Sequence, residues 1–203
     1  MKETDIILTA RIMSMVFMPF YLPIVGLVAL FVFSYMNMLD LGYKLTVLLM
    51  AYLFTILLPT LLIHYYRKHQ GWTLFDLSVK ERRLIPYLIS ILCYFTCYYL
   101  MTLMGIPQFM SLILMAALTI QVVCAIINIW WKISTHNAAI GGVAGALLAY
   151  SLLFQFDPQG WLCLVLIIAG LLGTSRMILR QHTLGQVIAG FMVGLICGFV
   201  VIV

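Results

Sequence analysis

The stretch FMSLILMAALTIQVVCAIINIWW, which runs from Phe109 to Trp131, is 23 residues long and contains no Asp, Glu, Lys or Arg. A hydrocarbon core about 30 Å thick is crossed by a helix of about 20 apolar residues. The stretch therefore predicts a transmembrane helix. The whole chain shares its character, since 65% of the 203 residues are apolar, 8% are charged and the mean hydropathy is +1.15. Soluble domains carry about 25% charged residues, so a soluble enzyme is excluded.

Other apolar stretches flank this one on both sides, and together they predict an all-α, polytopic transmembrane bundle of about six to seven spans. The chain should form one integral-membrane domain over residues 1–203, because backbone polar groups in lipid must be satisfied within each helix. Pro19 and Pro23 should kink the first span and Pro59 the second. The sixth should continue through Arg176, with its polar residues facing the protein interior. The further stretches are Ile12–Met36, Leu45–Tyr66, Leu84–Met104, Ala138–Phe154, Trp161–Gly173 and Thr183–Val203.

Basic residues gather on one side of the predicted membrane. Ten of the eleven lie there, and only Lys44 lies on the other side. The positive-inside rule then favours the cytoplasmic face of a bacterial cytoplasmic membrane, although any cations that serve a functional site add to the same count. The side of the site is left open. Between Arg67 and Arg83, Trp72 and Phe75 alternate with charges, which predicts a short interfacial amphipathic helix before the third span. No water-facing basic stripe suits a nucleic acid.

Glycines recur every four residues in two of the predicted spans, at Gly141 and Gly145 and again at Gly190, Gly194 and Gly198. Stripes of small residues let transmembrane helices approach closely. We expect these two spans to approach neighbouring helices closely.

Two short segments combine histidine with hydroxyl groups at predicted helix mouths. Ser134 and His136 come just before an apolar span, where the helix N-terminus favours an anion. An N-cap beside a surface histidine is the alternative interpretation. Further on, Gln186 lies four residues after His182, so its amide can accept from one ring nitrogen and leave the other for nucleophilic attack.

Ser175 and Arg176, followed after five residues by His182, resemble the third motif of the type 2 phosphatidic acid phosphatase family. The segment Ser134–His136 resembles the core of that family's second motif. The motifs occur in the family's order, and the likeness covers about residues 80–198, after two extra N-terminal spans. It implies a metal-independent phosphatase, without a cofactor, that removes phosphate from a lipid phosphate or diphosphate through a phosphohistidine.

The resemblance also implies a role for individual residues. By position, His182 would be the nucleophile on phosphorus and His136 would protonate the leaving oxygen. Ser134, Arg176 and the cations of the first motif would bind the phosphate oxygens. This agrees with phosphoryl transfer in general, which needs fixed cationic donors and an in-line nucleophile. Secondary candidates for the site are Arg82, Lys132, Thr135 and Ser175.

The chain departs from the family's pattern in each motif. The first motif is a Lys, six residues, then Arg-Pro, and its nearest match here is Lys80 with Arg83, three residues before Pro86. Lys80 and Arg83 would share one helical face, with Arg82 as a rival. The second motif has Ile133 and Thr135 in place of Pro and Gly.

Gln186 stands where the family has an Asp after the nucleophile. A neutral amide can fix the tautomer of His182, but it does not stabilise an imidazolium as a carboxylate does. We therefore expect slower turnover than in the family.

Carboxylates are too few on this side of the membrane for a two-metal mechanism, because only Asp76 and Glu81 lie there apart from the N-terminal tail.

Two alternatives stay open: a lipid phosphotransferase at the same site, and a catalytically weak pseudoenzyme that binds lipid phosphates. A transporter is disfavoured, since the polar residues within spans are chiefly Gln121 and Asn128. The expected partners are a lipid phosphate substrate and membrane lipids, and the oligomeric state is not predicted.

Overall fold

The computed structural model describes residues 3–33, 38–71 and 84–203, and within these ranges the chain is helical. A π-helical segment, Leu53–Leu57, joins two of the helices into one continuous rod. The α-helices are α1 (Glu3–Val16), α2 (Leu22–Phe33), α3 (Leu41–Tyr52), α4 (Leu58–His69), α5 (Leu84–Leu103), α6 (Gln108–Trp130), α7 (Thr135–Phe154), α8 (Gln159–Ile178) and α9 (Leu184–Ile202).

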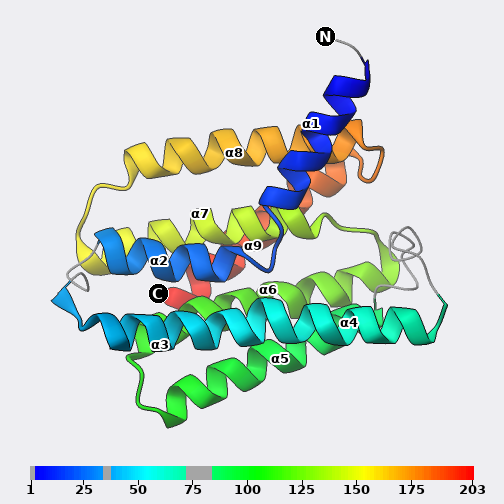
Figure 1. Cartoon of the computed structure of the whole chain (residues 1–203). Helices are drawn as coiled ribbons and strands as arrows, with labels where there is room; N and C mark the ends of the chain where they lie inside the picture. The colour runs from blue at the N-terminus through cyan, green and yellow to red at the C-terminus, as the bar shows by residue number, and fades with distance from the viewer. Residues whose placement is uncertain (1–2, 34–37, 72–83) are drawn as a thin grey trace.

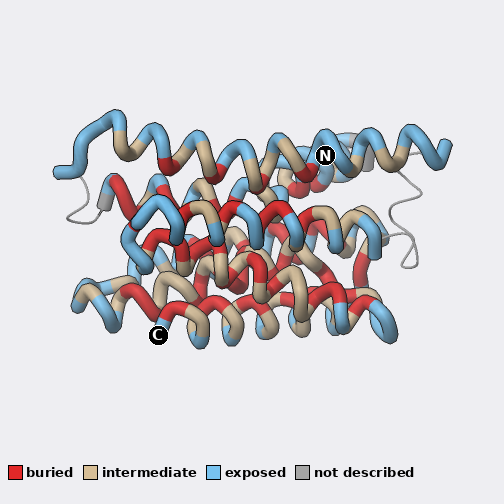
Figure 2. Tube along the Cα trace, turned by 90° about the horizontal axis from the view of Figure 1, so that it is seen from below, coloured by how far each residue is buried: buried red, intermediate tan, exposed pale blue. Residues whose placement is uncertain are grey.

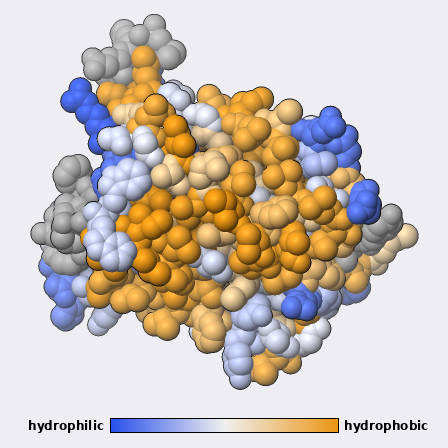
Figure 3. Space-filling view, turned by 180° about the vertical axis from the view of Figure 1, so that it is seen from behind, coloured by the Kyte–Doolittle hydropathy of each residue, from blue (hydrophilic) through white to orange (hydrophobic). Residues whose placement is uncertain are grey.

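Six helical segments of the described chain are long and apolar enough to cross a membrane. Figure 3 shows a broad hydrophobic belt across the middle of the molecule, with hydrophilic side chains gathered toward its two sides. The prediction of an all-α transmembrane bundle is confirmed, and the chain has the architecture of a multi-pass membrane protein. The six segments are Leu41–His69, Leu84–Leu103, Gln108–Trp130, Thr135–Phe154, Gln159–Ile178 and Leu184–Ile202.

The first predicted span is not one helix. It divides into α1, which packs against α8, and α2, which packs against α3, α6 and α7. The break at residues 17–21 contains Pro19, whose ring removes a backbone donor and stops a helix. Pro23 is the second residue of α2, a place in the first turn where proline is tolerated. At 12 residues α2 is too short to cross the bilayer fully.

Proline is accommodated differently in the second predicted span. The π-helical segment Leu53–Leu57 comes just before Pro59, and Leu58 N–H bonds five residues back to the oxygen of Leu53. This wider turn keeps α3 and α4 in one rod. The sixth predicted span continues as expected, since α8 reaches Ile178, with Ser175 and Arg176 buried. Thr174 is an exception to the expected inward orientation, because it is exposed.

Helices α7 and α9 make the most extensive helix pair of the described chain, and α9 lies behind α7 in the view of Figure 1. A Cβ added at Gly194 or Gly198 would clash with the backbone oxygen of Ala138 or Gly142, so the two backbones are in direct contact. The close approach that the glycine spacing predicts is confirmed, and the structure shows that the two stripes pack against each other. Buried residues concentrate on the inner sides of the helices (Figure 2).

The helix ends that carry the second and third predicted motifs lie at one end of the bundle. In Figure 1, α6 and α8 end there, and α7 and α9 begin there. The acidic residues Asp40 and Asp157 lie at the other end, before α3 and between α7 and α8. The predicted interfacial helix falls mostly on residues 72–83, which lie outside the described residues.

Candidate functional site

A tight chain reversal brings Arg176 and His182 to the same end of the bundle. Helix α8 closes in a Schellman-type ending, with Gln181 N–H donating to Arg176 O at 3.1 Å and Arg180 N–H donating to Met177 O at 2.9 Å. Arg180 takes a left-handed conformation with φ 51°. Such a conformation usually calls for glycine. The turn places His182 directly before the N-cap of α9, Thr183.

The capping box of α9 fixes the tautomer of His182. Gln186 Oε1 lies 3.2 Å from the backbone N of Thr183 and 3.2 Å from Nδ1 of His182. The backbone N–H is always a donor, so the Gln186 atom that faces it is the carbonyl oxygen. That oxygen can only accept, and the proton of a neutral His182 therefore sits on Nδ1. The ring's lone pair is then on Nε2.

A backbone contact joins the two motif segments. Ser134 N–H donates to the backbone oxygen of Gln186 at 3.3 Å. Gly190 makes this approach possible, because a Cβ there would come within 2.5 Å of Ser134 O. The glycine stripe of α9 thus does more than pack helices: it sets the distance between the Ser134 segment and His182.

Ser134 itself is fully buried and caps α7. Its hydroxyl donates to Asn137 Oδ1 at 3.0 Å and accepts from Asn137 N–H at 3.5 Å. Asn137 also donates through Nδ2 to Ala169 O on α8, at 3.4 Å. Gly173 leaves room for this amide, since a Cβ there would lie 3.2 Å from Nδ2. The mouth of α7 is therefore held to both α8 and α9.

His136 and Arg176 meet at one residue of α1, Ser14. His136 Nε2 lies 3.2 Å from the backbone oxygen of Ser14, and Arg176 Nη1 donates to its hydroxyl at 3.4 Å. A carbonyl oxygen only accepts, so Nε2 of His136 carries a proton. Ser14 and Arg176 are buried, with 6% and 8% of their surfaces exposed, and His182 is 7% exposed. The site is thus largely closed to solvent.

Other candidate residues are placed differently. The hydroxyl of Ser175 donates to Leu171 O within its own helix, at 2.8 Å, so this residue does not turn toward the site. Thr135 is half-buried at the first turn of α7, and Lys132 is half-buried in the connection that precedes it. Lys80, Arg82 and Arg83 lie outside the described residues, so their proposed contacts with phosphate stay predictions.

Sequence reasoning missed Ser14 and Asn137. Ser14 belongs to a segment read only as an apolar span, and its partners lie more than 120 residues away along the chain. Its one signal was a small polar residue within an apolar run. Asn137 stands directly beside the second motif, and its polarity in the first turn of a buried helix could have marked it.

Electrostatics at this end of the bundle favour an anion. Arg176, whose side chain is buried, lies at the same end of the bundle as the N-termini of α7 and α9, each of which carries a partial positive charge. In the part of the chain that the structure describes, no three His, Cys, Asp or Glu side chains gather as a metal site. The described residues at this end of the bundle thus include a buried cation, a ring nitrogen that carries a lone pair and a ring nitrogen that carries a proton.

Comparisons of the chain with protein-family models, with curated proteins and with solved structures found no match.

Proposed function

We propose that the protein is a membrane phosphatase that removes phosphate from a lipid phosphate or diphosphate through a phosphohistidine on His182, without a metal ion. The observation that carries the proposal is the difference between the two histidines at Nε2. His182 has its lone pair on Nε2, whereas His136 holds a proton on Nε2. A nucleophile and a proton donor are the two groups that this reaction needs.

In the first step, the lone pair on Nε2 of His182 attacks phosphorus and the bond between phosphorus and the leaving oxygen breaks. His136, charged as an imidazolium, gives its Nε2 proton, which is hydrogen-bonded to Ser14 O before the reaction, to that oxygen and becomes neutral. Arg176 stabilises the charge that spreads over the equatorial phosphate oxygens, and its planar guanidinium suits a two-pronged contact. Gln186 keeps the Nδ1 proton of His182 in place throughout.

In the second step, water attacks the phosphohistidine. His136, now neutral at Nε2, takes a proton from the water, and the bond between phosphorus and Nε2 of His182 breaks. Inorganic phosphate leaves, His136 is again an imidazolium, and His182 is again neutral with its proton on Nδ1. Both half-reactions thus use the same two nitrogen atoms.

The substrate is proposed to be a lipid because of where the site lies. The polar residues sit at the end of helices whose outer surfaces are apolar (Figure 3). A lipid headgroup reaches this level while its chains stay in the bilayer.

The test is phosphate release by detergent-purified protein in excess EDTA. We expect release from at least one member of a panel of phosphatidate, phosphatidylglycerol phosphate and a polyprenyl phosphate or diphosphate. His182→Ala should reduce release by at least about 1,000-fold, because covalent catalysis is lost.

The matched control is His69→Ala, which changes an exposed histidine at the end of α4. It should retain the wild-type rate. Equal melting temperatures would show that both variants fold. If the wild-type protein binds the lipid phosphates but releases no phosphate, the proposal of a phosphatase is overturned and that of a pseudoenzyme is supported. Undiminished release by His182→Ala would overturn the role of His182.

A further inference from the structure

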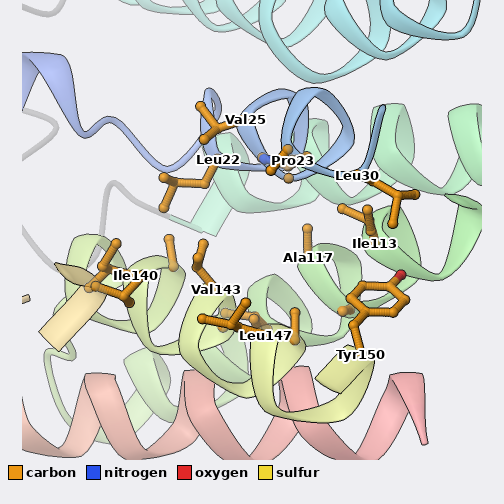
Figure 4. Close-up of a pocket in the computed structure, with 18 of the residues that line it drawn as sticks. Leu22, Pro23, Val25, Leu30, Ile113, Ala117, Ile140, Val143, Leu147 and Tyr150 are labelled. Carbon is orange, nitrogen blue, oxygen red and sulfur yellow. The ribbon is translucent and has the colours of Figure 1, made fainter. Parts of the chain in front are cut away.

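A cavity of about 900 Å³ lies inside the bundle, between α2 on one side and α6, α7 and α8 on the other. Figure 4 shows Leu22 and Leu30 of α2 facing Val143 and Leu147 of α7 across it. Its walls are mainly aliphatic and aromatic side chains. This volume is at the upper end of small-molecule sites, which measure about 300–1,000 Å³.

The cavity follows α7 along its length. It is lined by Thr135, the first residue of α7, and by Phe154, the last. A helix of 20 residues is about 30 Å long, which matches the thickness of the hydrocarbon core. The cavity therefore extends along the direction that a lipid chain follows in the membrane.

One end of the cavity adjoins the candidate site. Thr135 precedes His136 in the chain, and Phe17, another lining residue, lies one turn beyond Ser14. A group bound between His136 and Arg176 would thus be next to the cavity's end. The other end lies near Phe154 and Trp161, at the opposite end of α7.

The cavity is open toward the lipid. Val25 and Val28 of α2 and Leu164 of α8 line it, although 55%, 41% and 47% of their surfaces are exposed. These exposed lining residues form a rim between α2 and α8. A chain can enter through this rim from the side, without leaving the hydrocarbon layer.

Resting on the proposed function, we propose that this cavity holds the hydrocarbon chain of the lipid phosphate while its phosphate lies between His136 and Arg176. An apolar cavity left empty forfeits dispersion contacts with every atom of its lining. Lipid chains are as apolar as the walls, so transfer from bilayer to cavity brings little hydrophobic gain. The dispersion contacts between chain and walls then decide which substrates bind, and these contacts depend on the length and shape of the chain.

The test compares hexadecyl phosphate with octyl phosphate as substrates. Ala117 is a half-buried residue of α6 that lines the cavity (Figure 4). Ala117→Phe should lower the ratio of kcat/KM for the long chain over the short chain by about ten-fold, the low end of what apolar pockets achieve. Release from octyl phosphate should remain.

Two further variants change residues of equal exposure. Leu164 and Leu166 of α8 are both 47% exposed, but only Leu164 is a lining residue. Leu164→Trp should shift the chain-length ratio in the same direction as Ala117→Phe, and Leu166→Trp should leave it unchanged. An unchanged ratio in both Ala117→Phe and Leu164→Trp, with phosphate release intact, would overturn the cavity assignment alone.

Photolabelling tests the cavity without relying on turnover. Hexadecyl phosphate with a terminal diazirine, bound to His182→Ala, should label the far half of the cavity, near Tyr150 and Phe154, and Ala117→Phe should remove the label. Hexadecanol should not compete. Labels spread over the outer face of α5, or equal competition by hexadecanol, would show that the cavity holds bulk lipid and would overturn the proposal. Absence of phosphate release by the wild type would instead overturn the proposed function.

Discussion

The two long faces of α7 pack in opposite ways. On one face, a Cβ at Gly141 or Gly145 would clash with a backbone oxygen of α9, so no side chain separates the two helices. On the other face, Val143 and Leu147 line a cavity of about 900 Å³. One helix therefore combines a contact between backbones with an internal space large enough for a ligand.

This contrast separates two requirements of a membrane enzyme that acts on lipids. Groups that react with phosphorus must be held to within a fraction of an ångström. The face of α7 that packs on α9 supplies this precise placement, because Gly190 lets Ser134 reach the backbone of Gln186. A lipid chain needs space, and the face of α7 that lines the cavity provides it. We infer that one side of α7 holds the reacting groups in place and the opposite side holds the lipid chain.

The largest effect is expected from a substitution that disrupts the contact between α7 and α9. Gly194→Ala would place a Cβ against the backbone oxygen of Ala138, so α7 and α9 would have to separate. Overpacking of this kind costs about 1–3 kcal/mol and sometimes more. We expect a clearly lower melting temperature and a loss of phosphate release larger than the loss of folded protein, because the Ser134 segment moves with α7.

Gly170→Ala is the matched control. It adds the same methyl group to a transmembrane helix, but no atom lies within 4 Å of the new Cβ. Its melting temperature should equal that of the wild type or exceed it slightly, since alanine favours helix more than glycine does. Equal melting temperatures for Gly194→Ala and Gly170→Ala would contradict the contact between the backbones of α7 and α9.

A smaller effect is expected from substitutions of Gln186, which holds His182 at the mouth of α9. Gln186→Leu removes the acceptor that fixes the tautomer of His182, and we expect kcat to fall by about 100-fold, the low end for acid–base groups. Gln186→Glu keeps an acceptor of the same length and should retain the rate or raise it, because a carboxylate stabilises an imidazolium. Steady-state kinetics measure both. A Gln186→Leu variant with unchanged kcat would show that the contact is structural only.

Hydrophobicity alone predicted most of the bundle. Length and apolarity are sufficient for each span from Leu84 onward, because a helix in lipid must satisfy its own backbone. Glycine spacing predicted that α7 and α9 approach neighbouring helices closely, but only the structure shows that they pair with each other. The extension of α8 past Gly173 was predicted because the stretch Trp161–Gly173 is short for a span. The error at Ile12–Met36 has a physical cause: hydropathy does not register where a proline ends a helix, and Pro19 does so here.

The candidate site was only partly predictable. The contact between His182 and Gln186 was predicted from helical spacing, but His182 lies before the N-cap of α9, and the capping box of Gln186 with Thr183 makes the contact instead. Ser14 does not, because its contacts with His136 and Arg176 depend on how α1 packs on α8. The cavity was equally out of reach, since it arises from the spacing of four helices. The roles of Lys80, Arg82 and Arg83 stay predictions.

The central claim is that phosphate passes through His182, and rapid-quench mass spectrometry tests it most directly. Protein is mixed with its lipid phosphate in EDTA, stopped at high pH within milliseconds to seconds, and digested. We predict an acid-labile phosphate on His182 in the wild type, which forms before free phosphate appears and is absent in His182→Ala. Rapid release of phosphate with none on His182 at any quench time, or phosphate on another residue, would contradict the account.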